Sequence, residues 1–151
     1  LGVVGSDVIE EFDYSELYAP VDLKIGHCRL SVAMPEALAQ NDDPTQWSHI
    51  RVATKYVNVA RQYFASQGRQ IDPIKLYGAM ELAPIVGLAD VIVDVVDTGN
   101  TLKANGLEAR DLIAHSSARL VVSRVAMKTR HQHIAPIIER LNEWTKRAHA
   151  T

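Results

Sequence analysis

The stretch VIVDVVDTGNTL, residues 91–102, predicts a buried strand that ends in a ligand-binding turn. Its first half is β-branched and apolar apart from Asp94, which is typical of a strand covered on both faces. A carboxylate inside such a strand is costly unless it is paired or hydrogen-bonded, so Asp94 needs a partner. Asp97 and small polar residues follow at the carboxyl end of the strand, which is where open parallel sheets bind ligands.

The turn TGNT, residues 98–101, has the composition of an anion-binding loop. Gly99 lets the backbone approach a ligand, Thr98 and Thr101 supply hydroxyl donors, and the N–H groups at the start of the following helix point outward. Carboxylates accept hydrogen bonds from sugar hydroxyls and stabilise a sugar carbon that becomes cationic. Helix capping explains Asp97 or Thr98 better when each is taken alone. The complete pattern favours a sugar-phosphate site.

Strand and helix patterns alternate along the chain, and the strands read as continuous apolar runs. This arrangement predicts an α/β fold with mainly parallel sheets. The polar segment 35–47 is the best candidate for a mobile excursion. Residues 1–12 read as strand, loop and helix; further strands are expected at 21–34, with a bulge or bend at Gly26, and at 49–54, 73–77, 90–96 and 118–127, and helices at 55–68, 78–87 and 133–150.

Composition excludes several classes of protein. Sixteen Lys and Arg against eighteen Asp and Glu, with no basic block, argue against nucleic-acid binding. The single cysteine, Cys28, excludes an internal disulfide and a thiolate-rich metal site, and it fits a reducing compartment. His131 and His133 lie two apart on a predicted helix and do not face each other, so we expect no metal site there. Without a membrane-length apolar run or an export signal, we expect a cytoplasmic protein.

The run ELAPIVGLADVIVDVVDTGNTL, residues 81–102, resembles the signature of the ATP phosphoribosyltransferases, which open histidine biosynthesis. The flanking motifs LGVVGSDV, CRLSVA, RVATKYVNVARQYF and IKLYGAMELAP extend the resemblance over essentially the whole chain. The shared DTGNT motif is also similar to that of ordinary phosphoribosyltransferases, whose fold differs. The positions that match the signature are Glu81, Gly87, Ala89, Ile92, Asp94, Val95, Thr98, Gly99, Thr101 and Leu102.

The resemblance implies transfer of a phosphoribosyl group from phosphoribosyl pyrophosphate to N1 of ATP, with Mg²⁺ carried by the substrate phosphates. It implies that the adenine nitrogen itself attacks, so the protein positions and stabilises the reactants. Lys55, Tyr56, Tyr77 and Gly78 are expected as wall residues, although ordinary structural roles explain them equally well. By the same resemblance, Thr98, Gly99, Asn100 and Thr101, with Leu102 beside them, hold the 5-phosphate, and Glu81, Asp94 and Asp97 surround the ribose and support charge at C1.

The family fold implies two lobes like those of periplasmic binding proteins, joined by crossing strands, with the first lobe incomplete. Residues 1–27 would be the remainder of the first lobe and a crossing strand, 28–115 the second lobe with the site, and 116–151 the return strand and helix. Leu1 opens inside an apolar run, so we expect the family's N-terminal basic segment to be lacking and the chain alone to turn over poorly. The short form implies a homodimer within a hetero-oligomer that includes a regulatory subunit related to histidyl-tRNA synthetase.

Two other functions remain open. A phosphoribosyltransferase for another base would use the same turn, although the spacing from Glu81 to Gly87 argues against it. A non-catalytic lobe that holds a sugar phosphate, or that serves as an assembly scaffold, would keep the turn without the transfer reaction.

Overall fold

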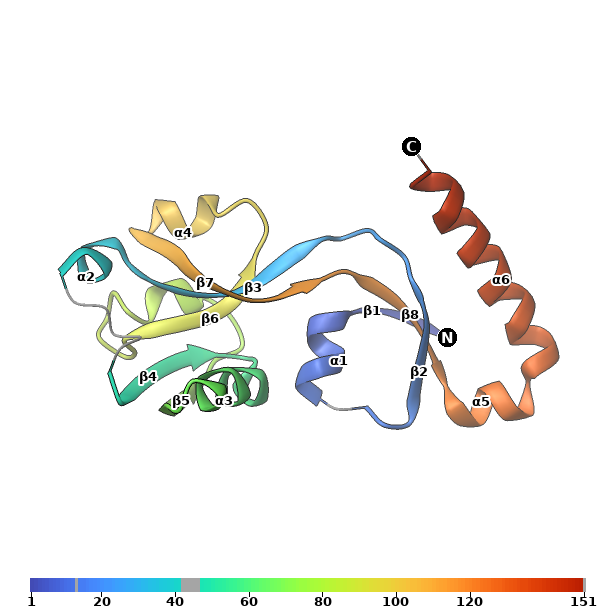
Figure 1. Cartoon of the computed structure of the whole chain (residues 1–151), viewed down its shortest axis with the longest axis horizontal. Helices are drawn as coiled ribbons and strands as arrows, with labels where there is room; N and C mark the ends of the chain where they lie inside the picture. The colour runs from blue at the N-terminus through green and yellow to red at the C-terminus, as the bar shows by residue number, and fades with distance from the viewer. Residues whose placement is uncertain (13, 42–46, 151) are drawn as a thin grey trace. The chain divides into compact units, whose positions relative to one another are not determined.

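A computed structural model describes residues 1–12, 14–41 and 47–150 of the chain (Figure 1). The chain divides into two compact units, one made of Leu1–His27 with Ser116–Thr151 and the other of Cys28–His115. Each unit is built around its own sheet. Within the described residues, no helix combines the length and the apolar character needed to cross a bilayer.

The first unit is a three-stranded antiparallel sheet with strand order β1-β8-β2. Its small core consists of Val21, Leu23 and Leu120, against which Ile138 and Leu141 of the last helix pack. These two residues are three apart in the helix expected at 133–150, so they share one of its faces. The elements are β1 (Gly2–Gly5), α1 (Ser6–Phe12), β2 (Leu17–Asp22), β8 (Ala118–Ser123), α5 (Arg124–Thr129) and α6 (His131–Ala148).

The second unit is a five-stranded mixed sheet with strand order β5-β4-β6-β3-β7. Strand β4 pairs in parallel with β5 and β6, whereas β3 pairs antiparallel with β6. The elements are β3 (Cys28–Pro35), α2 (Glu36–Asn41), β4 (His49–Thr54), α3 (Val57–Ser66), β5 (Gln70–Lys75), the 3₁₀ turn η2 (Met80–Leu82), β6 (Val91–Val96), α4 (Asn100–Ala104) and β7 (Leu107–Ser116).

The expectation of mainly parallel sheets is therefore wrong outside β4, β5 and β6. Alternating strands and helices fix a parallel direction only where a helix crosses between neighbouring strands, as α3 does between β4 and β5. Strands β3 and β6 are neighbours in the sheet but distant in sequence, so the alternation did not determine their direction.

Three predicted elements differ from the structure. The strand expected at 21–34 is two strands in different sheets, separated by residues with positive φ at Lys24 and Gly26. The strand expected at 118–127 ends at Ser123, because the Ser123 hydroxyl caps α5 by accepting a hydrogen bond from the Ala126 N–H. The helix expected at 78–87 is reduced to η2 and turns.

Of the mobile excursion expected at 35–47, residues 36–41 form α2, and 42–46 lie outside the described residues.

Candidate functional site

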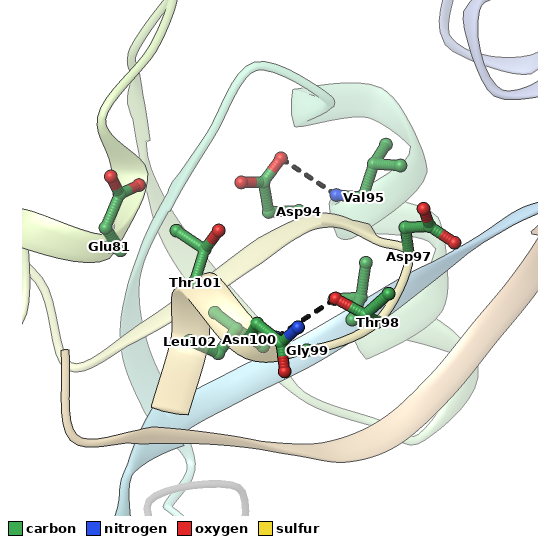
Figure 2. Close-up of a pocket in the computed structure, with 10 residues that line it drawn as sticks. Glu81, Asp94, Val95, Asp97, Thr98, Gly99, Asn100, Thr101 and Leu102 are labelled. Atoms are coloured by element: carbon green, nitrogen blue, oxygen red, sulfur yellow. Dashed lines mark hydrogen bonds between the residues drawn. The ribbon is translucent and has the colours of Figure 1, made fainter. Parts of the chain in front are cut away.

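A pocket of about 260 Å³ lies at the carboxyl end of β6 (Figure 2). Most of its wall comes from the uninterrupted stretch 94–102, and Glu81 enters from the separate segment that carries η2. The predicted ribose and phosphate residues thus come together in one concavity. The lining consists of Glu81, Asp94, Val95, Val96, Asp97, Thr98, Gly99, Asn100, Thr101 and Leu102.

Strand alternation explains why Asp94 faces this pocket. Successive side chains of a strand point to opposite faces of the sheet, so Asp94 shares a face with Ile92 and Val96. Those two residues pack in the cluster that also contains Met80 of η2 and Leu102 of α4. Val91 and Val93 belong instead to the cluster that contains α3. Asp94 therefore projects toward the elements that carry Glu81 and the turn.

The partner that the sequence requires for Asp94 is the next residue, because the Val95 N–H donates to Asp94 Oδ1 at 2.8 Å. Burial raises the pKa of the Asp94 carboxyl above its ordinary value, and the charge of Glu81 adds to this rise. The Val95 N–H and the charge of Lys55 oppose it and favour the ionised form. The charge of the Asp94 carboxylate is therefore compensated only in part by its surroundings.

The raised pKa of Asp94 predicts a pH-dependent stability. The folded state binds this proton more tightly than the unfolded state, so its stabilising contribution is complete below the unfolded pKa and is lost as the pH rises through the folded pKa. We expect the melting temperature of the wild type, relative to that of Asp94→Asn, to rise on acidification from about pH 7 to about pH 4. Paired thermal denaturation measures the difference, and a difference that is constant with pH would contradict the assignment.

The turn that follows β6 is ordered by local bonds. Gly99 has φ 84°, in the left-handed region, at the N-cap position of α4. The Thr98 hydroxyl accepts a hydrogen bond from the Asn100 N–H at 3.3 Å, and the Lys103 N–H donates to the Gly99 carbonyl at 3.0 Å. Thr98 therefore has a local structural contact as well as a place in the pocket wall. Asp97 is exposed, and its main-chain carbonyl accepts from Arg29 Nη2 at 3.5 Å.

The four expected wall residues do not belong to the pocket lining. Tyr56 is 2% exposed and packs in the core on the other face of the sheet, which supports its structural explanation. Tyr77 is 84% exposed, with Lys75 Nζ 5.6 Å from its ring centroid, and Gly78 is exposed as well.

Lys55 differs from the other expected wall residues because it lies close to the pocket. The parallel register pairs Ala53 with Ile92, and continuing it by two residues places Lys55 level with Asp94. Its ammonium lies 5.1 Å from the Tyr56 ring centroid, and its charge reaches the Asp94 carboxyl. Lys55 thus stands beside the pocket at the same edge of the sheet.

Sequence reasoning missed Arg29 of β3. It lies with Lys103 in a second cavity of about 260 Å³, which shares the turn residues Thr98, Gly99 and Asn100 with the first pocket. The sequence signal was weak, because an arginine in an alternating strand usually marks a solvated face.

The family model and the curated relatives that match this chain carry the same description. The family model described as ATP phosphoribosyltransferase matches residues 1–143. Curated proteins named ATP phosphoribosyltransferase are 60% identical over 139 residues in Rhizorhabdus wittichii and 57% identical over 147 residues in Marinobacter nauticus. These matches cover 92% and 97% of this chain, but only 63% and 66% of the relatives.

Solved structures agree with the sequence relatives. The ATP phosphoribosyl transferase (HisG:HisZ) complex from Thermotoga maritima matches with a TM-score of 0.84 and 35% identity, over 97% of this chain and 70% of that chain. The periplasmic aliphatic sulphonate binding protein SsuA from Escherichia coli matches with a TM-score of 0.58 and 14% identity, over 96% of this chain and 54% of its own. The second likeness shows that the fold is of the periplasmic-binding-protein kind.

Proposed function

The chain belongs to the ATP phosphoribosyltransferase family, and from this premise we propose that it transfers the phosphoribosyl group of phosphoribosyl pyrophosphate to N1 of ATP, in histidine biosynthesis. The observation that carries the proposal is the pocket that gathers Glu81, Asp94, Asp97 and the turn 98–101 in one concavity. A phosphate on the turn and a ribose beside the carboxylates would match the chemistry of these groups.

In the proposed reaction, the bond between C1 of the ribose and pyrophosphate breaks, and its electron pair leaves with the pyrophosphate. The lone pair of adenine N1 forms the new bond to C1. Positive charge that develops at C1 would be stabilised by the carboxylates of Asp94 and Glu81, while the turn fixes the 5-phosphate. These residues orient the reactants and complement charge, and no protein nucleophile takes part.

The donor set of the pocket also fits Mg²⁺, which we propose enters with the substrate phosphates. Magnesium takes oxygen ligands and is commonly bound through one or two carboxylates together with phosphate oxygens. Asp97, which is exposed in the pocket lining, supplies such oxygens. When bound, the ion would neutralise the charge on the pyrophosphate leaving group.

We further propose that the active form is a homodimer in the cytoplasm, assembled with a regulatory subunit related to histidyl-tRNA synthetase. The likeness to a solved HisG:HisZ complex at 35% identity supports the second subunit. The remaining wall residues, Lys55, Tyr77 and Gly78, are proposed to approach the substrate only from the rim, because they follow β4 and β5 at the carboxyl edge of the sheet.

Formation of phosphoribosyl-ATP tests the proposal. We expect the protein, incubated with ATP, phosphoribosyl pyrophosphate, Mg²⁺ and the regulatory subunit, to release pyrophosphate and form the N1-linked product, with much less product when the subunit is omitted. A reaction without phosphoribosyl pyrophosphate is the control. Transfer to another base but not to ATP would favour the alternative transferase. Binding of phosphoribosyl pyrophosphate without transfer to any base would favour a sugar-phosphate-binding lobe.

A further inference from the structure

We infer that Arg51 and Asp90 are positioning residues, whose ion pair fixes the segment 80–90 and thereby holds Glu81 in the pocket. We call this pair the Arg51–Asp90 clamp. The inference rests on the proposed function, because it assigns a purpose to the same pocket. Neither residue lines the pocket, so neither is assigned contact with substrate.

Arg51 donates to the Asp90 carboxylate from its side chain and its main chain, and the Asp90 main chain donates back to Arg51. Arg51 Nη2 donates to Asp90 Oδ1 at 3.0 Å, and Arg51 Nε donates to Asp90 Oδ2 at 3.3 Å. The Arg51 N–H donates to Asp90 Oδ2 at 3.0 Å, and the Asp90 N–H donates to the Arg51 carbonyl at 2.9 Å. This two-pronged geometry distinguishes the clamp from an ordinary surface pair.

A further bond extends the clamp into the segment. Arg51 Nη1 donates to the Gly87 carbonyl at 3.1 Å, so one arginine of β4 holds two points of the segment. The Asp90 side chain is 17% exposed. Although burial would raise the pKa of Asp90, hydrogen bonds from Arg51 and its charge keep that pKa below its ordinary value.

The segment 80–90 contains no α-helix or β-strand, and apart from the clamp it is held by a 3₁₀ turn, local backbone hydrogen bonds and a few buried side chains. Its backbone is in the left-handed region at Gly87, with φ 76°, and so is that of Ala79, with φ 54°, immediately before the segment. Of its own residues, Met80, Ala83 and Ala89 are buried. Its outward side chains add little packing, because the large apolar residues Leu82, Ile85, Val86 and Leu88 are exposed.

Glu81 is the residue through which the clamp would act. Its charge reaches Asp94 and contributes to the raised pKa of that carboxyl. If the segment loosened, Glu81 would move away and water would gain access to Asp94. Both changes lower the pKa of Asp94 toward its ordinary value. The titration of Asp94 therefore reports the position of Glu81 without any ligand.

Asp90→Asn tests the clamp, and Asp72→Asn is its matched control. Asp72 of β5 also pairs with a residue of β4, with His49 Nε2 at 2.6 Å from Asp72 Oδ2, but both side chains are exposed and Asp72 lies outside the segment 80–90. Calorimetry would measure the Kd for phosphoribosyl pyrophosphate, and carbon NMR would follow the Asp94 carboxyl with pH. Arg51→Lys is a second variant, because lysine keeps the positive charge but lacks the planar guanidinium group that donates to both carboxylate oxygens.

We expect Asp90→Asn to raise the Kd by about tenfold to a hundredfold and to lower the pKa of Asp94. Arg51→Lys should give a smaller change in the same direction, and Asp72→Asn should leave both quantities unchanged. Should Asp90→Asn fail to fold, Arg51→Lys decides the question. Wild-type values for Asp94 titration in the folded clamp variants would overturn the inference. Absence of binding by the wild type would instead overturn the proposed function, while the Asp94 titration would still decide the role of the clamp.

Discussion

Gly99→Val is expected to abolish binding of phosphoribosyl pyrophosphate. Gly99 has φ 84° and ψ 1°, and a left-handed conformation costs an L-residue about 1–2 kcal/mol, with β-branched residues the worst suited. The turn would relieve this strain by rotating its peptides, which would turn N–H donors away from the phosphate that is proposed to bind there. Each hydrogen bond lost to a charged group costs about 1.5–3 kcal/mol. The loss of two such bonds weakens binding by more than about a hundredfold, which calorimetry resolves readily.

Gly68→Val is the matched control for this variant. Gly68 also has positive φ, at 74°, and no described atom lies within 4 Å of the position that a Cβ would occupy. It follows α3 and is not part of the pocket lining. The control therefore introduces the same backbone strain away from the site, and its affinity should match that of the wild type. Undiminished binding by Gly99→Val would exclude the turn as the phosphate site, and equal losses in both variants would indicate general destabilisation.

The second large effect concerns Asp94 and Asp97. Replacing either residue with asparagine should lower turnover by about a hundredfold, because a fixed charge that stabilises the transition state is lost. The melting temperature at neutral pH should change little. An asparagine at position 94 can still accept the Val95 N–H, and Asp97 is exposed. For Asp94→Asn, removal of a poorly compensated, partly buried charge should even raise the melting temperature slightly.

Both quantities must be measured on the same preparations. Thermal denaturation gives the stability, and formation of phosphoribosyl-ATP in the presence of the regulatory subunit gives the turnover. Thr129→Ser is the control. The Thr129 hydroxyl is exposed on α5, donates to the Val125 carbonyl and is not part of the pocket lining. A large fall in melting temperature with normal turnover would show that the two aspartates serve the fold instead of the ligand.

The sequence predicted the parts of the site that depend on local chemistry. An apolar strand, a carboxylate within it and a small polar turn after it are all encoded in 91–102, and strand β6 has the expected extent. The sequence did not identify the partners of Asp94. One is the neighbouring Val95 N–H, which depends on the rotamer, and the other is the charge of Lys55, which only the parallel register of β4 and β6 places nearby.

Three other features could not be predicted from the sequence: where a strand ends, which face of the sheet a side chain joins, and the direction in which two distant strands pair. The apolar run 118–127 continues past Ser123, and the capping bond of that serine outweighs the strand pattern. Tyr56 stands at the start of α3, where spacing alone does not reveal which face of the sheet its ring will join. The antiparallel pairing of β3 with β6 joins residues that are far apart in the chain, as in the match of Arg29 with Val96.

The residues that line the pocket are close together in the chain, so the site can be inherited as a unit. Because Glu81 and the stretch 94–102 lie close together in the chain, a genetic exchange with breakpoints outside 80–102 would transmit the lining as one block. The Arg51–Asp90 clamp crosses that boundary, since Arg51 lies on β4. A chimaera between distant relatives would therefore receive an intact lining whose support depends on the recipient's residue at position 51.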